Sequence, residues 1–468
     1  MLNNTTAGWP QKPLSEVVDI NPRLDKTAYR DDLEVSFVPM AAVEAGSGRM
    51  EVSQTKHFST VKKGYTPFRE SDVLFAKITP CMENGKMAVV PKLTNGLGFG
   101  STEFHVLRPH EGIDPRFVYY FISSQNFRRE AAHRMTGAVG QKRVPQSFLE
   151  EALIPVPLFD DQKSIVAEIE KQFSRLDEAV ANLKRVKANL KRYKASVLKS
   201  AVEGKLTEDW RKQHPDVEPA SKLLDRILAE RRAKWNGRGK YKEPSVPEAT
   251  DLPSLPRGWV WATVDQVAAP ELNSITDGPF GSNLKTEHYK ETGPRVIRLQ
   301  NIGDCVFVNE EAHISEEHFT RLQKHRIFAG DLVIAALGED PPRSCLIPQS
   351  VGHAIVKADC IRFKPHKDVG AKYLNVVLNS QPTRQRAKSI VHGVGRPRLN
   401  LGEIKAIVVP VPPTVEQQAI VAEVERRLSV IEELEAAVEA NLTRADRLRQ
   451  SILGQAFSGK LLFNGARG

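Results

Sequence analysis

Two stretches of the chain decide the fold, and they resemble each other. Residues 162–206 read QKSIVAEIEKQFSRLDEAVANLKRVKANLKRYKASVLKSAVEGKL, and residues 417–461 read QQAIVAEVERRLSVIEELEAAVEANLTRADRLRQSILGQAFSGKL. They align without a gap at an offset of 255 positions, and the Pro-Val-Pro at 155–157 recurs at 410–412 with the same offset. A repeat in constant register indicates a duplicated structural unit.

Both stretches have the spacing of coiled-coil helices. Apolar residues recur every seven positions, and a second apolar row completes the seam. We expect one long helix in each half, beginning after the proline motif and ending at Gly204 and Gly459. The rows are Val166, Phe173 and Val180 with Ile169, Leu176, Leu183, Leu190 and Val197 in the first helix, and Val421, Leu428 and Leu442 with Val424, Ile431, Val438 and Ile452 in the second.

The charges indicate how the two helices pair. Each helix is acidic in its earlier part, as at Glu168 and Glu432, and basic in its later part, as at Lys194 and Arg447. Antiparallel pairing brings opposite charges together, whereas parallel pairing opposes like charges. Roughly 40 residues at about 1.5 Å each predict a rod of about 60 Å with a globular block at either end. The alternative is that each helix packs on its own block.

The repeat predicts the domain organisation and the fold class. We expect an α+β protein with two globular mixed α/β domains, separated by two long antiparallel helices that form a coiled coil, in a pseudo-twofold internal repeat. Short strands are predicted at 73–76 and 332–335, and Asn84-Gly85 predicts a hairpin. The expected segments are 1–155 (globular domain 1), 156–206 (helical region 1), 207–257 (connector), 258–410 (globular domain 2) and 411–468 (helical region 2).

The connector contains its own helical pattern between Lys222 and Trp235. Four prolines between 244 and 256 then indicate an extended linker. The helix is either a docking face for another subunit or a cover over the rod, and its sequence does not separate the two.

Composition limits the class of protein. The 67 Lys and Arg against 57 Asp and Glu give a net charge of +10, which suits a polyanionic partner without identifying one. Four scattered cysteines imply neither disulfides nor a zinc site, so we expect a cytoplasmic protein. We also expect no membrane partner and no export, because there is neither a long apolar run nor a signal pattern.

Motifs for catalysis are missing from the sequence. There is no phosphate-binding loop, and no nucleophile, base and metal arrangement stands out. Asp340-Pro341-Pro342-Arg343 resembles a methyltransferase motif, but an arginine stands where an aromatic ring stacks on a flipped base. The sequence therefore predicts a non-catalytic protein with no catalytic residues, no metal and no cofactor of its own.

Polar and basic residues near the ends of predicted strands are candidates for DNA contacts. Arg and Lys pair with guanine, and Asn and Gln pair with adenine, whereas the alternative for any one of them is an ordinary solvated surface. We place Arg298, Gln300 and Asn301 on one further strand. The candidates are Lys77, Thr79, Lys86, Gln141, Lys142, Arg143, Lys285, Arg298, Gln300, Asn301, Arg343, Ser344, Arg396 and Arg398.

The region 68–90, with its core DVLFAKITPCMENGK, and the region 276–302, with DGPFGSNLK and VIRLQNI, closely resemble target-recognition domains of type I restriction-modification specificity subunits. The two helix ends, SVLKSAVEGKL and SILGQAFSGKL, strengthen the resemblance, which extends over nearly the whole chain. It implies a subunit that recognises a bipartite asymmetric site in double-stranded DNA.

The resemblance also implies partners and their cofactors. It implies that methylation subunits dock on the helices and that restriction subunits then assemble, and we expect two methylation subunits. S-adenosylmethionine, ATP and Mg²⁺ are used by those partners. Two other classes stay open from the residues alone: a solitary DNA-binding regulator, and a coiled-coil adaptor without enzyme partners.

Overall fold

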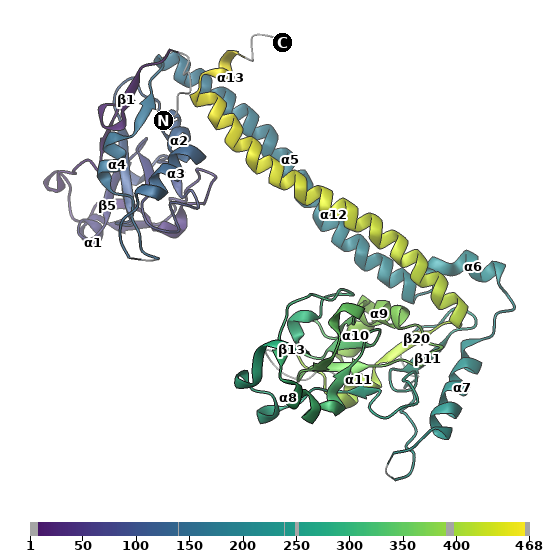
Figure 1. The fold of residues 1–468 in the computed structure, drawn as a ribbon. Coiled ribbons are helices and arrows are strands. Elements are labelled where there is room, and N and C mark those ends of the chain that lie inside the picture. The colour runs from purple at the N-terminus through teal and green to yellow at the C-terminus, as the bar shows by residue number, and fades with distance from the viewer. Residues whose placement is uncertain (1–7, 139, 238, 249–251, 390–396, 464–468) are drawn as a thin grey trace. The chain divides into compact units, whose positions relative to one another are not determined.

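The computed structural model describes residues 8–138, 140–237, 239–248, 252–389 and 397–463. The chain divides into two compact units, residues 1–185 with 438–468 and residues 186–437. Each unit contains one mixed α/β domain and part of both long helices (Figure 1).

The first domain is built from two four-stranded sheets and one two-stranded ribbon. The strand orders are β2-β9-β6-β7, β4-β3-β8-β5 with β3 parallel to β8, and β1-β10. The expected hairpin at Asn84-Gly85 joins β6 to β7, and Gly85 has a positive φ of 71°. The elements are β1 Gln11–Pro13, β2 Val18–Ile20, β3 Glu34–Val38, β4 Thr55–His57, α1 Phe58–Val61, β5 Thr66–Arg69, β6 Val73–Ala76, β7 Met87–Val89, β8 Leu97–Gly100, β9 Phe104–Pro109, α2 Pro115–Ser123, α3 Gln125–Arg134, α4 Gln146–Glu151 and β10 Leu153–Pro155.

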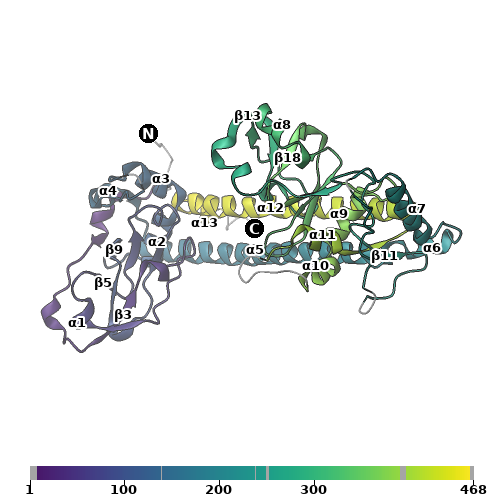
Figure 2. The ribbon, with the colours of Figure 1, turned by 90° about the horizontal axis from the view of Figure 1, so that it is seen from below.

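The second domain repeats this topology strand for strand. Its orders are β12-β19-β16-β17, β14-β13-β18-β15 with β13 parallel to β18, and β11-β20. Helix α8 packs beside β13 (Figure 2). The elements are β11 Val260–Thr263, β12 Ile275–Thr276, β13 Tyr289–Ile297, β14 His313–Ile314, α8 Glu316–Arg321, β15 Arg326–Ile327, β16 Leu332–Ala335, β17 Arg343–Leu346, β18 Ala354–Val356, β19 Cys360–Phe363, α9 Ala371–Asn379, α10 Gln381–Lys388, α11 Leu401–Ala406 and β20 Val408–Val411.

A buried ion pair recurs at the same place in both domains. Asp72, directly before β6, accepts two hydrogen bonds of 2.8 Å from Arg108 on β9. Asp331, directly before β16, accepts a 2.6 Å bond from Arg362 on β19. Both carboxylates are buried. Because a buried charge needs a partner, each arginine fixes the start of the central strand.

The long helices are α5, Phe159–Val202, and α12, Thr414–Phe457, each of 44 residues. The predicted seam is the buried face: Val424, Ile431, Val438 and Ile452 are 1–6% exposed. In the first unit, residues 165–173 pack with residues 452–461, and Asp177 pairs with Arg449. Ascending positions on one helix meet descending positions on the other, so the helices run antiparallel.

A glutamine ties the start of each long helix to its domain. Gln162 donates to the carbonyl of Pro157 at 3.0 Å and accepts from the backbone of Asp114 at 3.0 Å, just before α2. Gln417 makes the matching two bonds, at 2.9 and 2.7 Å. Together with the duplicated topology, these contacts confirm the predicted fold class of two mixed α/β domains with two long antiparallel helices.

The connector begins after α5 with α6, Glu208–Gln213, and α7, Ala220–Ala233, which covers the expected helix. Helix α7 lies on the second domain, where Glu230 meets His366 at 3.0 Å and Arg231 pairs with Asp265 at 3.1 Å. The last element in the described part of the chain is α13, Lys460–Phe463.

Candidate nucleic-acid interface

The first domain gathers several candidates where β6 ends. The backbone of Lys77 donates to the carbonyl of Glu103 at 2.9 Å and accepts from Val144 at 2.9 Å. Two residues on, Thr79 donates to the carbonyl of Lys142 at 3.0 Å. The segment 77–79 is therefore held between the turn before β9 and the loop before α4. Lys77 and Thr79 are half-buried and Lys142 is exposed. The Thr79 hydroxyl donates to the Met135 sulfur at 3.7 Å.

Arg143 is already occupied by a carboxylate. Its guanidinium donates to Glu103 at 2.9 Å through Nε and at 2.6 Å through Nη2. Hydrogen bonding from Arg143 holds the pKa of the Glu103 carboxyl below its usual range, so the pair stays ionised. Arg143 also donates to the carbonyl of Gln141 at 3.2 Å. A contact from Arg143 to a base requires breaking this pair.

Lys86 stands at the base of the β6–β7 hairpin. Its backbone carbonyl accepts from Ala76, the last residue of β6, and its Nζ donates to the carbonyl of Met40 at 3.0 Å. Arg343 holds the matching place in the second domain, because it pairs across the sheet with Ala335, the last residue of β16. A basic residue thus recurs at the same hairpin position.

The second domain repeats the framework around its own strand end. The backbone of Ala336 donates to Asp359 at 2.9 Å and accepts from Leu399 at 2.8 Å, and Gly338 donates to Pro397 at 3.3 Å. Arg398 pairs with Asp359 at 2.8 Å. The bonds match those of the first domain, but alanine, glycine and proline stand where the first domain has lysine, threonine and lysine.

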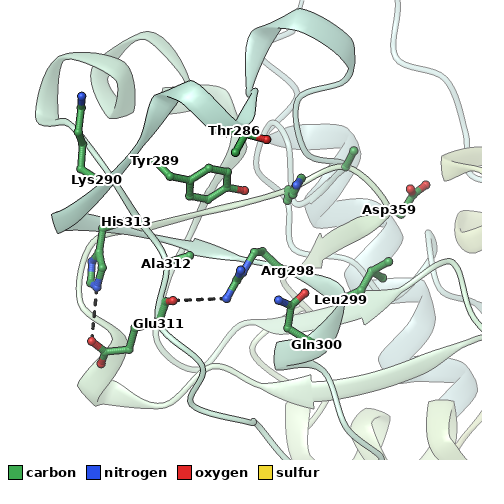
Figure 3. Close-up of a pocket in the computed structure, with 12 residues that line it drawn as sticks. Thr286, Tyr289, Lys290, Arg298, Leu299, Gln300, Glu311, Ala312, His313 and Asp359 are labelled. Atoms are coloured by element: carbon green, nitrogen blue, oxygen red, sulfur yellow. Dashed lines mark hydrogen bonds and ion pairs between the residues drawn. The ribbon is translucent and has the colours of Figure 1, made fainter. Parts of the chain in front are cut away.

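Polar side chains of the second domain instead surround a pocket of about 620 Å³ next to this edge (Figure 3). Both of its carboxylates are paired: Glu311 with Arg295 at 3.2 Å, and Asp359 with Arg398. The lining residues are Thr286, Tyr289, Lys290, Arg298, Leu299, Gln300, Glu311, Ala312, His313, Lys357, Ala358 and Asp359.

Arg298 and Tyr289 face the same space in the pocket (Figure 3). Arg298 donates to the carbonyl of Glu311 across 3.4 Å, a long bond. Its Nε and the Tyr289 hydroxyl are buried and lack a hydrogen-bond partner among the described residues. Buried polar groups normally have partners, so the pocket can accommodate an acceptor such as a phosphate or a base edge.

Two candidates lie in the interior, which contradicts their expected contact with bases. Asn301 is 0% exposed, and its side chain donates to the carbonyls of Val308 and Glu310, both at 2.8 Å. Ser344 is also 0% exposed and donates to Asn375 at 2.8 Å. Asn301 secures an internal turn, whereas Ser344 joins β17 to α9. In both cases a polar residue that bonds inside the fold has the same sequence signature as a polar residue on a surface.

The strand expected at 298–301 is also wrong. Strand β13 ends at Ile297, and residues 299–301 form a 3-10 turn in which the Asn301 side chain accepts from the backbone of Arg298 at 2.8 Å. This turn directs Arg298 and the exposed Gln300 to the pocket. Lys285 is exposed and lies beside Thr286 at the pocket's rim, whereas Arg396 lies outside the described residues.

Four residues of these edges were missed by the sequence reasoning: Glu103, Asp359, Tyr289 and Lys357. The signal for two of them was present, because Glu103 and Asp359 correspond in the two halves at an offset of 256 positions, as Arg143 and Arg398 do at 255. Across the described part of the chain there is no group of three or more His, Cys, Asp or Glu placed to hold a metal ion. The helices in these same ranges are all too short or too polar to span a bilayer.

Comparison with known proteins matches this architecture to one family. The model of the type I restriction modification DNA specificity domain matches residues 7–192 and 296–444. The chain is similar to the specificity subunit of the type I restriction enzyme EcoAI of Escherichia coli, at 28% identity over 95% of this chain and 82% of the relative. The EcoEI specificity subunit of Escherichia coli is 26% identical over the same shares.

Two solved structures have a similar fold. A chain from a structural study of complex assembly and conformational transition of the type I R-M system aligns with a TM-score of 0.68 at 20% identity, covering 98% of this chain and 100% of that chain. The HsdS subunit from Thermoanaerobacter tengcongensis aligns with a TM-score of 0.53 at 17% identity, over 97% of each chain.

Proposed function

Because the chain belongs to the family of type I restriction modification DNA specificity domains, it is the sequence-specific DNA-binding subunit of such a system, and we propose that each of its two domains reads one half of a bipartite asymmetric site. Its part in the system is recognition and not catalysis. We assign the first reading domain to residues 1–155 and the second to residues 258–410, with helical regions at 156–206 and 411–468 and a connector at 207–257.

One observation carries this proposal: the two domains share a framework but differ in the side chains mounted on it. The backbone bonds around residues 77–79 match those around residues 336–338 pairwise. The side chains differ, because Ala336 and Gly338 of the second domain occupy the positions of Lys77 and Thr79 in the first. A duplicated scaffold with exchanged polar groups is suited to reading two different sequences, since base edges are distinguished by donor and acceptor pattern.

The proposed contacts differ between the domains. In the first domain we assign contact with DNA to Lys77, Thr79, Lys86, Gln141 and Lys142. In the second we assign it to Lys285, Arg298, Gln300 and Arg343, with Lys357 and Tyr289 completing the pocket. Arg and Gln in one pocket supply donors for guanine and both donor and acceptor for adenine.

The partners follow from the system to which the family belongs. We propose that two methylation subunits dock on the helical regions and that restriction subunits join that complex. In this arrangement S-adenosylmethionine serves the methylation subunits, and ATP and Mg²⁺ serve the restriction subunits. We favour neither a solitary regulator nor a coiled-coil adaptor, because the similar proteins are specificity subunits of type I restriction enzymes.

A domain exchange tests the proposal. Residues 258–410 are replaced by the corresponding block of a relative, and the DNA methylated by the chimera with its methylation partners is sequenced. We expect one half of the methylated sequence to change and the other half to stay. A change in both halves, or in neither, contradicts independent reading.

A further inference from the structure

The same ion pair closes the reading edge of both domains. In the first pair, Arg143 binds Glu103 through two nitrogens, at 2.9 and 2.6 Å. In the second pair, Arg398 binds Asp359 at 2.8 Å. Each acidic residue directly precedes the strand next to the central one, β9 or β19, and each arginine lies in the loop before α4 or α11.

The two pairs join equivalent pieces of backbone. The arginines form β-bridges to Ile78 and Leu337, the middle residues of the segments that follow β6 and β16. These segments are therefore enclosed between the acidic residue on one side and the arginine loop on the other. Breaking the ion pair removes one of the contacts that hold the arginine loop against the segment proposed to contact bases.

Stability is an insufficient reason for the recurrence of these pairs. The side chains of Arg143 and Glu103 are 44% and 23% exposed, and those of Arg398 and Asp359 are 49% and 22% exposed. Ion pairs with this much solvent contribute little to folding. The surrounding side chains differ between the two domains, whereas an acid–arginine pair is present in both. This recurrence points to a role of the pair at the edge of the domain.

We propose that Arg143–Glu103 and Arg398–Asp359 are positioning pairs, each holding the recognition edge of its own domain in register with one half-site. The arginines, taken from the sequence as base readers, act here through Glu103 and Asp359. Specificity in the first domain then lies with the side chains that this pair places, above all Lys77, Thr79 and Lys142. The inference rests on the proposed division of the DNA site between the domains.

A double-mutant cycle separates positioning from direct reading. The variants are Glu103→Gln, Arg143→Gln and the two combined, each assembled with the methylation partners. The probe is duplex DNA carrying the bipartite site that the wild-type complex selects from a randomised library, together with duplexes altered by one base in either half. The measurement is discrimination, the ratio of the dissociation constants for altered and selected duplexes.

If the pair positions the edge, both single variants lose about tenfold of the discrimination at one half-site, and the double variant loses no more than either, because residues in one network couple. Discrimination at the other half-site stays at the wild-type value. If Arg143 reads a base, Arg143→Gln loses discrimination while Glu103→Gln does not, and that result overturns the proposal. Equal loss at both half-sites also overturns it, because it indicates a global defect.

The second domain supplies the matched control. Asp359→Asn and Arg398→Gln are expected to lower discrimination only at the half-site that the first set leaves intact. Unchanged discrimination in all of these variants, in a wild-type complex that reads both halves, refutes the positioning role and leaves the proposed function standing. A wild-type complex that selects no bipartite site refutes the proposed function itself.

Discussion

The two domains of this chain share their strand orders, their buried Asp–Arg pair and the backbone bonds at their reading edges, and they differ in what those edges present. The first domain places Lys77, Thr79 and Lys142 there. The second has alanine, glycine and proline at the same three places and carries its polar groups in the neighbouring pocket around Arg298 and Gln300.

The difference indicates that the framework and the reading groups are physically separable. Backbone bonds depend little on the side chain, so Ala336 and Gly338 can make the bonds that Lys77 and Thr79 make. Base reading, by contrast, depends on side-chain donors and acceptors. If the proposed residues contact bases, duplication followed by divergence of surface side chains is sufficient to give one fold two specificities.

The largest effect is expected where the framework itself is cut. Asp331→Ala leaves Arg362, whose side chain is 6% exposed, with the more distant Glu271 at 3.3 Å as its remaining carboxylate partner. Breaking a buried pair costs about 3–5 kcal/mol of unfolding free energy. Asp72→Ala costs less, since the side chain of Arg108 is 28% exposed and can be hydrated. Denaturant unfolding followed by hydrogen exchange assigns each loss to one unit.

An exposed pair provides the control for that comparison. Arg30 and Asp32 pair at 2.6 Å with side chains 85% and 65% exposed, so Asp32→Ala is expected to leave unfolding unchanged. If Asp331→Ala is as stable as the wild type, or if Asp72→Ala is the more damaging variant, the duplicated pair does not fix the central strands.

The reading groups give the next largest effect. Lys77→Ala is expected to weaken reading of one half-site and Arg298→Ala of the other, each by about 1–3 kcal/mol of binding discrimination, the value of a good base contact. Binding of the assembled complex to duplexes altered in either half measures both. Loss at the same half-site in the two variants contradicts the assignment of one half to each domain.

The duplicated architecture was predictable because its signals are periodic. Apolar residues every seven positions and a repeat at 255 positions depend only on which residues recur, and the helices and paired domains follow from that. The sites were less predictable. Asn301 and Ser344 had the residue types of base readers, but tertiary contacts bury them, and nothing in the local pattern distinguishes these cases.

The alignment of the two halves also contains a signal for the ion pairs at the domain edges. Arg143 aligns with Arg398 at 255 positions, and Glu103 aligns with Asp359 at 256. A chemically matched acid and base in both halves indicates an ion pair, but only the fold brings residues 40 positions apart together. The pocket around Tyr289 and Lys357 could not be predicted in this way, because the aligned positions of the first half do not carry matching residues.

Acid is expected to destabilise the first domain through His105. His105 donates from Nε2 to the carbonyl of Val144 at 2.9 Å and accepts at Nδ1 from the Asn21 amide at 3.0 Å, so its neutral form is fully bonded. Burial lowers its pKa from 6.5, with Lys77 opposing and Glu103 favouring the charge. Since the unfolded chain binds this proton more readily, the first domain loses stability as pH falls below about 6.5.

The matching position in the second domain is Ile361, which does not titrate. The pKa of His325 in the second unit is also lowered by burial, so the test follows the first unit alone. Its hydrogen-exchange protection is expected to fall between pH 7.5 and pH 5.5. His105→Gln keeps one donor and one acceptor and is expected to reduce that difference. A first unit equally protected at both values in the wild type rules out His105 as its cause.

The smallest effect concerns the pocket's contribution to general DNA affinity. Lys357 lies 5.6 Å from the centre of the Tyr289 ring, at the mouth of a pocket whose carboxylates are already paired. If Lys357 contacts a phosphate, Lys357→Ala weakens binding about equally for all sequences and reduces the slope of log affinity against log salt by about one. A salt series with selected and altered duplexes measures both quantities.

Lys222→Ala, on the connector helix α7, is the matched loss of one positive charge and should leave the slope unchanged. Loss of discrimination at a single base, with an unchanged slope, would instead make Lys357 a reader of sequence and bring the second domain closer to the first, where three of the five proposed contacts are lysines.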